Sequence, residues 1–146
     1  MEMNATTVID RPVDTVFTYV NDVSNDVYWR TGVTESGLRS DPPLGPGSIG
    51  YARAGDTETE YRIVSYIAGK SVDWELFRGP FQGRGGYRLE PVDTGTQFTL
   101  LADIEPSGVY KVLGPVFGWM GSRRNQADVD KLREILESTP AQPSGS

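Results

Sequence analysis

The feature that most constrains the fold is a long run of short apolar and polar alternations between Val33 and Glu105. One clear example is the stretch 72–76, in which Val72, Trp74 and Leu76 alternate with two acidic residues. Turn-forming residues interrupt the run at intervals of roughly ten residues, a spacing typical of antiparallel strands joined by hairpins. Because side chains on a strand alternate between two faces, each strand offers one apolar face to a common interior. The run therefore predicts about six antiparallel strands.

Helical patterns stand on both sides of this run. Val13, Val16, Phe17 and Val20 recur at helical spacing, and the preceding Pro12 suits a first helical turn. A strand is expected before this helix, over 6–9, and a second short helix or turn after it, carrying Val27, Tyr28 and Trp29. Helical spacing returns from about 107 to 137, where Pro115 is expected to kink or restart the helix. The order of elements predicts an α+β fold.

The length predicts one domain. A chain of 146 residues, 37% of them apolar, is long enough to bury a substantial core. We find no internal repeat and no linker, and we expect a single domain over residues 1–137. The last nine residues, 138–146, lack an apolar anchor and are expected to be disordered.

The absence of two residue types excludes much chemistry. With no cysteine and no histidine, the sequence holds no thiolate nucleophile, no histidine-assisted triad and no Cys/His metal site. The remaining titratable side chains have ordinary pKa values far from neutrality, which lowers the expectation of acid–base catalysis. Whether the protein is an enzyme stays open, and the composition favours a non-catalytic role. We expect no cofactor.

The charge balance indicates which partners to expect. A net charge of −6 disfavours nucleic acid as a partner. No apolar run is long enough to span a bilayer, and no export signal is visible, so we expect a cytoplasmic protein without membrane insertion. A monomer or a homodimer is equally compatible with the sequence.

Three local motifs resemble functional signatures but are better explained as structure. Residues 45–50 match G-x-G-x-x-G, yet a strand rather than a helix follows, which favours a turn. Residues 83–86 are glycine-rich and are expected to form a flexible or bulged strand entry. Asp56, Glu58 and Glu60 alternate on one strand face, where a solvated hairpin edge is more plausible than a cation site. We therefore expect no metal.

Several segments together resemble a known family. They are residues 9–22 followed by Trp29, residues 44–48 entering a strand, residues 87–96, and residues 130–137. In order and spacing they resemble the START-like, birch-pollen-allergen-like superfamily (SRPBCC), and within it the polyketide cyclase/dehydrase and lipid-transport group. The resemblance implies a helix-grip fold, in which a curved antiparallel sheet of about seven strands wraps around a long C-terminal helix, with two short helices after the first strand. It also implies a cavity for a hydrophobic small molecule.

The candidate cavity residues are large or amphipathic side chains expected on inward faces. They are Trp29, Tyr51, Arg53, Tyr61, Trp74, Tyr87, Phe98, Leu100, Tyr110, Leu113, Phe117 and Met120. Taken singly, each is better explained as an ordinary core residue, and it is the set together that indicates a cavity. Arg53 enters the cavity mouth if Ile49 points inward, whereas with the opposite register, or at a solvated strand end, it stays outside.

Three functions follow as hypotheses. The first is binding or transport of a lipid, isoprenoid or polyketide-like molecule. The second is an aromatase/cyclase-like enzyme acting on a poly-β-keto or aromatic substrate, in which Arg53 and Tyr61 are the candidate catalytic residues that stabilise an enolate. The third is a protein–protein adaptor, which would require a large apolar patch outside the cavity.

Overall fold

The computed structural model of the chain describes residues 1–107 and 114–138. Seven strands and four helical segments occur in these residues, one of the latter a single 3-10 turn, η1. In chain order they are β1 (Ala5–Ile9), α1 (Val13–Asn21), η1 (Val23–Asn25), α2 (Asp26–Trp29), β2 (Glu35–Leu38), β3 (Ile49–Ala54), β4 (Thr57–Ile67), β5 (Ser71–Arg78), β6 (Phe81–Val92), β7 (Gly95–Pro106) and α3 (Gly114–Ser138).

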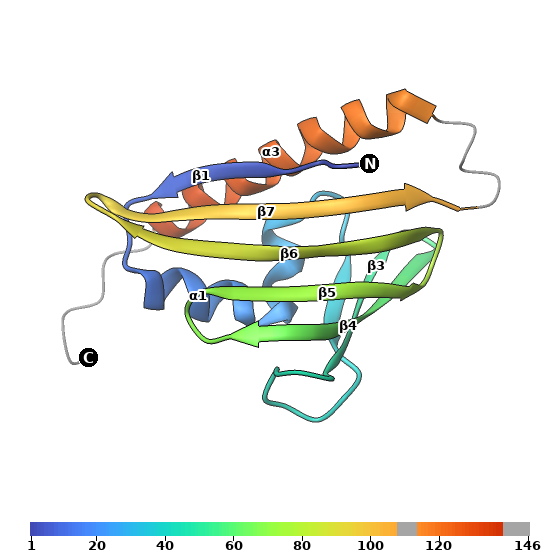
Figure 1. Cartoon of the computed structure of the whole chain (residues 1–146), viewed down its shortest axis with the longest axis horizontal. Helices are drawn as coiled ribbons and strands as arrows, with labels where there is room; N and C mark the ends of the chain where they lie inside the picture. Colours follow the sequence, from blue (N-terminus) through green and yellow to red (C-terminus); the bar gives the residue numbers. More distant parts are fainter. Residues whose placement is uncertain (108–113, 139–146) are drawn as a thin grey trace.

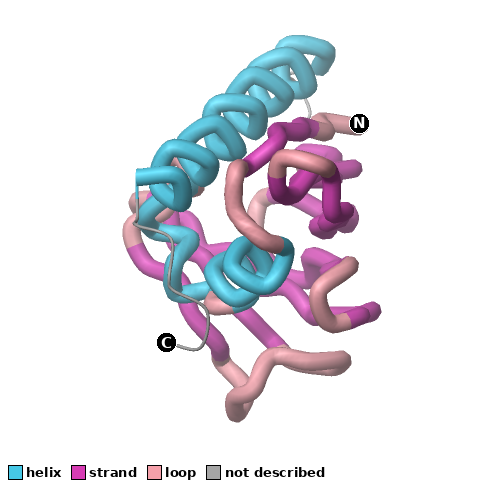
Figure 2. Tube along the Cα trace, turned by 90° about the vertical axis from the view of Figure 1, so that its left-hand side faces the viewer, coloured by secondary structure: helices cyan, strands magenta, loops and turns pink. Residues whose placement is uncertain are grey.

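The strands form one antiparallel sheet in the order β1-β7-β6-β5-β4-β3-β2. Apart from the pairing of β1 with β7, every strand pairs with its neighbour in the sequence, because hairpin connections join β2 through β7. Figures 1 and 2 show the sheet curving, with the helices on the inner side of the curve. This arrangement confirms the predicted α+β helix-grip fold, including the strand number and the short helices after the first strand.

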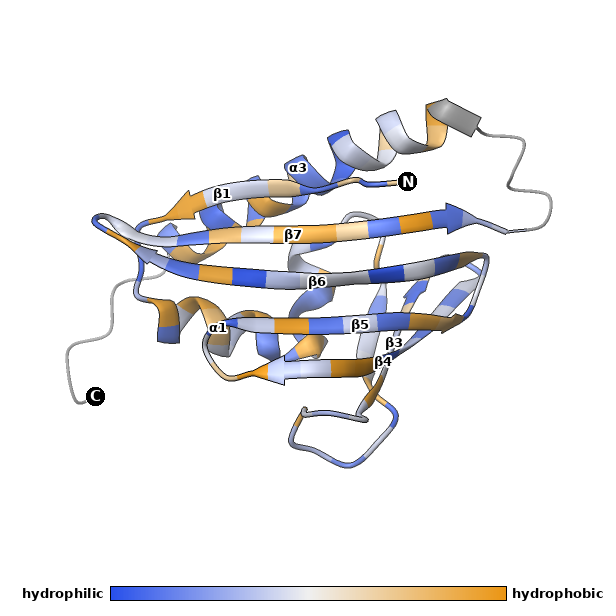
Figure 3. Cartoon of the chain, viewed as in Figure 1, coloured by the Kyte–Doolittle hydropathy of each residue, from blue (hydrophilic) through white to orange (hydrophobic). Residues whose placement is uncertain are grey.

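The inward faces of the strands follow the predicted alternation. On β7, Phe98, Leu100 and Ala102 are buried while the residues between them are more exposed. The same alternation of apolar and polar residues along the central strands is visible in Figure 3. Each strand therefore contributes one apolar face to the concave side of the sheet, where the helices and the core lie.

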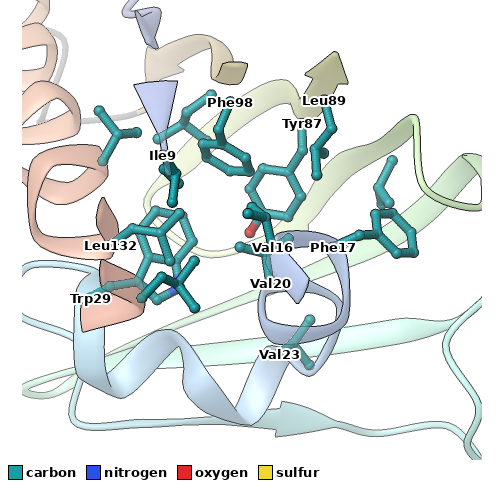
Figure 4. Packing of buried hydrophobic residues seen from close by; sticks show 14 of the residues in the cluster. Ile9, Val16, Phe17, Val20, Val23, Trp29, Tyr87, Leu89, Phe98 and Leu132 are labelled. Carbon is teal, nitrogen blue, oxygen red and sulfur yellow. The ribbon is translucent and has the colours of Figure 1, made fainter. Parts of the chain in front are cut away.

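The core is centred on Trp29, which is 2% exposed. Its ring lies 6.1 Å from the rings of both Tyr87 and Phe98, so α2, β6 and β7 meet at this residue (Figure 4). The apolar stripe of α1 packs into the same cluster, with Val16 and Val20 fully buried. The predicted amphipathic helix is thereby confirmed, and it closes one end of the curved sheet.

The long helix differs from its predicted pattern at the N-terminal end. Val129 and Leu132 are fully buried as expected, but Val116 and Met120 are more than half exposed. In these first turns Phe117 and Met120 line a cavity, whereas Val116 does not. Pro115 stands in the first turn of the described helix, which suits a residue without an N–H donor.

The structure describes only part of the predicted C-terminal helix and tail. Residues 108–113, which the sequence pattern assigns to the helix, lie outside the described residues, as do residues 139–146 of the predicted tail. Ser138, predicted as the first residue of that tail, is the last residue of α3. Its hydroxyl donates a 2.6 Å hydrogen bond to the Glu134 carbonyl in the last turn of the helix.

A buried polar cluster fixes α3 to the segment after α2. Asp128, 2% exposed, accepts a hydrogen bond from the Thr31 backbone N–H at 3.0 Å and forms an ion pair with Arg30 Nε at 3.2 Å. One turn earlier, Asn125 donates to the Met3 carbonyl at 2.7 Å. Because Asp128 and Asn125 are buried and each has a hydrogen-bond partner in another segment, they fix the position of α3 against Met3 and the segment after α2.

Candidate ligand-binding site

A cavity of about 480 Å³ lies between the inner face of the sheet and the helices. Strands β3 to β7 supply one side of it, and α1, α2 and α3 supply the other. Its size falls within the usual range for small-molecule sites in proteins. The cavity exists because a curved sheet and a straight helix diverge, and the side chains between them do not fill the whole gap.

Aliphatic side chains form much of the wall. Ile63, Val72, Leu76, Leu100 and Ile104 line the cavity from three strands, β4, β5 and β7. They all belong to the inward set of the predicted alternation. Such a surface is suited to an apolar ligand, because burying the ligand's hydrocarbon surface away from water makes binding favourable.

Aromatic rings form a second part of the wall. The ring of Trp74 lies 4.8 Å from that of Tyr87 and 6.1 Å from that of Tyr61. Two glycines make room for these rings. A Cβ at Gly85 would lie 2.9 Å from the Trp74 ring, and a Cβ at Gly50 would lie within 2.6 Å of Tyr61 ring atoms. The glycine-rich stretch 83–86 is therefore the interior of β6, with no register shift against β5 or β7, and not a bulged strand entry.

Substitution of Gly85 tests this packing. In Gly85→Ala the new methyl group would meet the Leu101 carbonyl oxygen at 2.8 Å and the Trp74 ring at 2.9 Å. We expect the free energy of unfolding to fall by about 1–3 kcal/mol, as for other overpacked interiors. Urea denaturation measures this change. Gly45→Ala is the control, because a Cβ there meets no atom within 4 Å; equal stability of both variants would contradict the proposed role of Gly85.

The cavity has a polar end, formed where α1 stops and α2 begins. Asn21, Asp26 and Arg30 line it. Asp26 is only 9% exposed, and its Oδ1 has no hydrogen-bond partner among the described residues. Burial disfavours the carboxylate and raises the pKa of Asp26 to about 7, although the positive charge of Arg30 acts in the opposite direction.

Arg30 is engaged away from Asp26. Besides its ion pair with Asp128, its Nη2 lies 3.4 Å from Asn125 Oδ1 and its guanidinium lies 5.2 Å from the centre of the Trp29 ring. The arginine thus contributes positive potential to the polar end, while its Nε is committed to the buried cluster on α3. Arg30 therefore lowers the pKa of Asp26 by less than burial raises it.

The two buried phenols on the cavity wall stay neutral. Burial raises the pKa of Tyr61 and of Tyr87 above the ordinary value of 10. Tyr61 and Tyr87 therefore serve as apolar wall with a neutral hydroxyl, and neither supplies a phenolate near neutral pH.

The structure brings together about half of the side chains that the sequence nominated. Those lining the cavity are Tyr61, Trp74, Tyr87, Leu100, Phe117 and Met120. Trp29 and Phe98 do not line it but pack in the core beside it. Tyr110 and Leu113 lie outside the described residues.

Arg53 and Tyr51 lie on the wrong side of β3 for the cavity. The inward-facing residue of this strand is Ala52, so the register is opposite to the one that would bring Arg53 inside. Arg53 is exposed and pairs with Glu35 at 3.2 Å and Glu58 at 3.5 Å. Tyr51 packs under the Arg39 guanidinium, 3.7 Å from its ring centre. The prediction of a cavity arginine at position 53 is therefore wrong.

The polar residues that line the cavity were not among those predicted from the sequence; they are Asn21, Asp26, Arg30, Thr59, Arg124 and Asn125. Asp26 and Arg30 flank the short helix predicted around Trp29, where an acidic residue before a helix is usually a solvated cap. Asp26 lies instead in the interior, because α2 is only four residues long and turns its first residue toward the sheet. A signal existed in the spacing of four between Asp26 and Arg30, which places both on one helical face.

The curved sheet, the enclosing helices and the apolar cavity define the helix-grip class of proteins. Within this class, the chain belongs to the family described as polyketide cyclase / dehydrase and lipid transport, whose model matches residues 1–137, and so to the SRPBCC superfamily. The comparison with curated proteins gave no match. Among the described residues, no helix is long and apolar enough to cross a membrane.

Solved structures with the same fold share little sequence with this chain. The protein TTHA0849 from Thermus thermophilus has a TM-score of 0.76 at 14% identity, covering 94% of this chain and 98% of its own. Zhui aromatase/cyclase from Streptomyces sp. R1128 has a TM-score of 0.72 at 15% identity, covering 94% and 93%. MLL2253 from Mesorhizobium loti has a TM-score of 0.72 at 13% identity, covering 96% and 99%. At these identities the similarity establishes the fold alone.

Proposed function

We propose that this protein binds a hydrophobic small molecule, such as a lipid, isoprenoid or polyketide-like compound, in its internal cavity. The observation that carries the proposal is the cavity of about 480 Å³, whose walls are mainly aliphatic and aromatic and which has a polar end where α1 stops and α2 begins. An enclosed apolar site with few polar groups favours binding by burial of ligand surface, with the polar groups fixing its orientation.

Filling the cavity tests the proposal. In Ala102→Phe the added ring would extend from β7 into the space that a ligand needs, because Ala102 lines the cavity. We expect prodan, a neutral apolar fluorophore, to bind the unmodified protein with a blue-shifted emission and to lose at least about tenfold in affinity in this variant. The measurement is a fluorescence titration at constant protein concentration.

The matched control is the neighbouring residue on the same strand. Leu101 is half-buried, belongs to the other face of β7 and does not line the cavity, so Leu101→Phe is expected to bind prodan as the unmodified protein does. Equal affinity of Ala102→Phe and the unmodified protein, or no binding by either, would refute the proposed function.

A second function is favoured by one observation. Asp26 is a carboxyl group with a pKa of about 7 at the cavity, as a general base for enolisation requires. An aromatase/cyclase-like reaction on a poly-β-keto chain would use Asp26 as the base. Of the two residues predicted to stabilise the enolate, Tyr61 lines the cavity and Arg53 does not. Turnover of a model poly-β-ketone that falls in Asp26→Asn would support it, and no turnover by the unmodified protein would dismiss it.

The adaptor hypothesis ranks below both. The exposed apolar side chains of Val116, Trp119 and Met120 lie along the first turns of α3, and Met120 also lines the cavity. This apolar surface is thus continuous with the cavity mouth and is not a separate docking face. A cytoplasmic location and a monomeric or homodimeric state stay predictions, and light scattering of the purified protein tests the latter.

A further inference from the structure

We propose that the polar end of the cavity recognises a hydroxyl group, which donates its hydrogen bond to the Asp26 carboxyl group beside Asn21, so that the ligand is an apolar alcohol or phenol. The inference rests on the proposed binding function and adds the chemical class of the ligand. It concerns the pair of side-chain oxygens at the corner between α1 and α2.

Both oxygens are buried acceptors without a donor. Asn21 is the last residue of α1 and Asp26 the first of α2, and both line the cavity. In each side chain the Oδ1 atom is buried and has no hydrogen-bond partner among the described residues. A buried acceptor left unpaired costs folding free energy, so two of them at the end of one cavity indicate that a donor from a ligand completes the site.

The charges around the pair select the type of donor. A carboxylate ligand has no proton to donate and would be repelled by Asp26 whenever that residue is ionised, and a pure hydrocarbon supplies no donor either. An ammonium ligand would have to carry its charge out of water into a mostly apolar cavity, which costs more free energy than burying a neutral hydroxyl group. A neutral hydroxyl group supplies the donor without either penalty.

The protonation state of Asp26 gives the inference a signature. The charged groups that act on it are Arg30, Asp22 and Asp128, and the phenols of Tyr61 and Tyr87 share its environment. Above its pKa of about 7 the carboxylate only accepts hydrogen bonds, and a ligand must donate. Below that pH the protonated carboxyl can donate to any ligand oxygen, so the advantage of a hydroxyl group should shrink.

Decanol and methyl nonyl ether provide the test, because these isomers differ only in whether the oxygen carries a proton. Each displaces prodan from the protein in a competition titration at pH 5 and at pH 8. We expect decanol to bind about tenfold more tightly than the ether at pH 8, the worth of one hydrogen bond to a charged acceptor, and the ratio to approach one at pH 5.

Variants assign the preference to the polar end. Asp26→Leu should bring the ratio close to one at both pH values, and Asp26→Asn, which keeps the side-chain shape, should make the ratio independent of pH. Asp14→Asn, an exposed residue of α1 outside the cavity, is the control and should retain the preference of the unmodified protein. Circular dichroism of each variant verifies folding.

The possible outcomes distinguish a failure of hydroxyl recognition from a failure of the proposed binding function. Equal binding of both isomers by the unmodified protein at pH 8, or a preference that persists in Asp26→Leu, overturns hydroxyl recognition while leaving apolar binding intact. Failure of both isomers and of prodan to bind overturns the two proposals together.

Discussion

Replacing Trp29 with alanine is expected to lower the free energy of unfolding by about 3–5 kcal/mol, the usual cost of truncating a fully buried tryptophan. Trp29 is 2% exposed and packs against Tyr87, Phe98 and other core residues from the sheet and helices. Its loss would leave a void beside the ligand cavity. Because domains of this kind are stabilised by only about 5–15 kcal/mol, a shift of this size is large.

Urea denaturation followed by far-UV circular dichroism measures the loss, with Trp119→Ala as the matched control. Trp119 lies on α3 with 61% of its surface exposed, and its contact with Arg123 is on the outside of the helix. We expect its removal to cost less than about 0.5 kcal/mol, as is typical of surface substitutions. Similar losses from both variants would show that Trp29 is not the centre of the core.

The second large effect is a pH-dependent stability difference between the unmodified protein and Asp26→Asn. The pKa of Asp26 rises from 3.8 in the unfolded chain to about 7 in the folded protein. Below pH 3.8 the carboxyl is protonated in both states. Between these two pKa values, Asp26 is ionised in the unfolded chain but still protonated in the folded protein, so the free energy of unfolding falls as the pH rises. Above about pH 7 the carboxylate is ionised in both states, and the full cost of burying it is present.

This shift corresponds to about 4 kcal/mol, since one pKa unit is worth about 1.4 kcal/mol. Relative to the unmodified protein, Asp26→Asn should therefore gain stability progressively from about pH 4 to about pH 8. Denaturant titrations at several pH values give the free energy of unfolding of both proteins. The other carboxyl groups contribute equally to both, so their contribution cancels in the difference. Asp14→Asn should show no such trend, and a flat difference for Asp26→Asn would contradict a buried carboxyl at this position.

The pattern of the sequence was sufficient for the sheet. Alternation of period two fixes which side chains face inward wherever a strand has one buried face, and the inward residues of β5, β6 and β7 follow it at Val72, Trp74, Tyr87, Phe98 and Leu100. Glycine and proline marked the turns, because few other residues adopt their dihedral angles. The short helix α1 was also predictable, because its apolar residues recur at helical spacing and lie on one buried face.

The polar end of the site was not predictable in the same way. On β3 the strand pattern is ambiguous, because Gly50 and Ala52 are small enough to lie beneath a cavity while the larger Tyr51 and Arg53 face outward. Alternation alone assigns the larger residues to the interior, which is why Arg53 was misplaced. The inward position of Asp26 depends on the turn between two short helices, and local pattern carries little information about such a turn.

An unpaired buried carboxyl is an expensive feature for a small domain to retain. Its cost is avoided by asparagine or by an apolar residue of similar size, and such changes are among the simplest ways to stabilise a protein. Under the proposed hydroxyl recognition this cost has a purpose, because the group that destabilises the empty fold would be the one that orients the ligand.

Isotope-filtered NMR of the labelled protein with unlabelled decanol tests directly whether the cavity between the sheet and the helices binds an apolar ligand. We predict intermolecular NOEs from the alkyl chain to methyl groups of Ile63, Val72 and Leu100, which line the cavity from three different strands. NOEs confined to outward methyl groups such as those of Val8 and Val64, which are 42% and 51% exposed, would contradict the account.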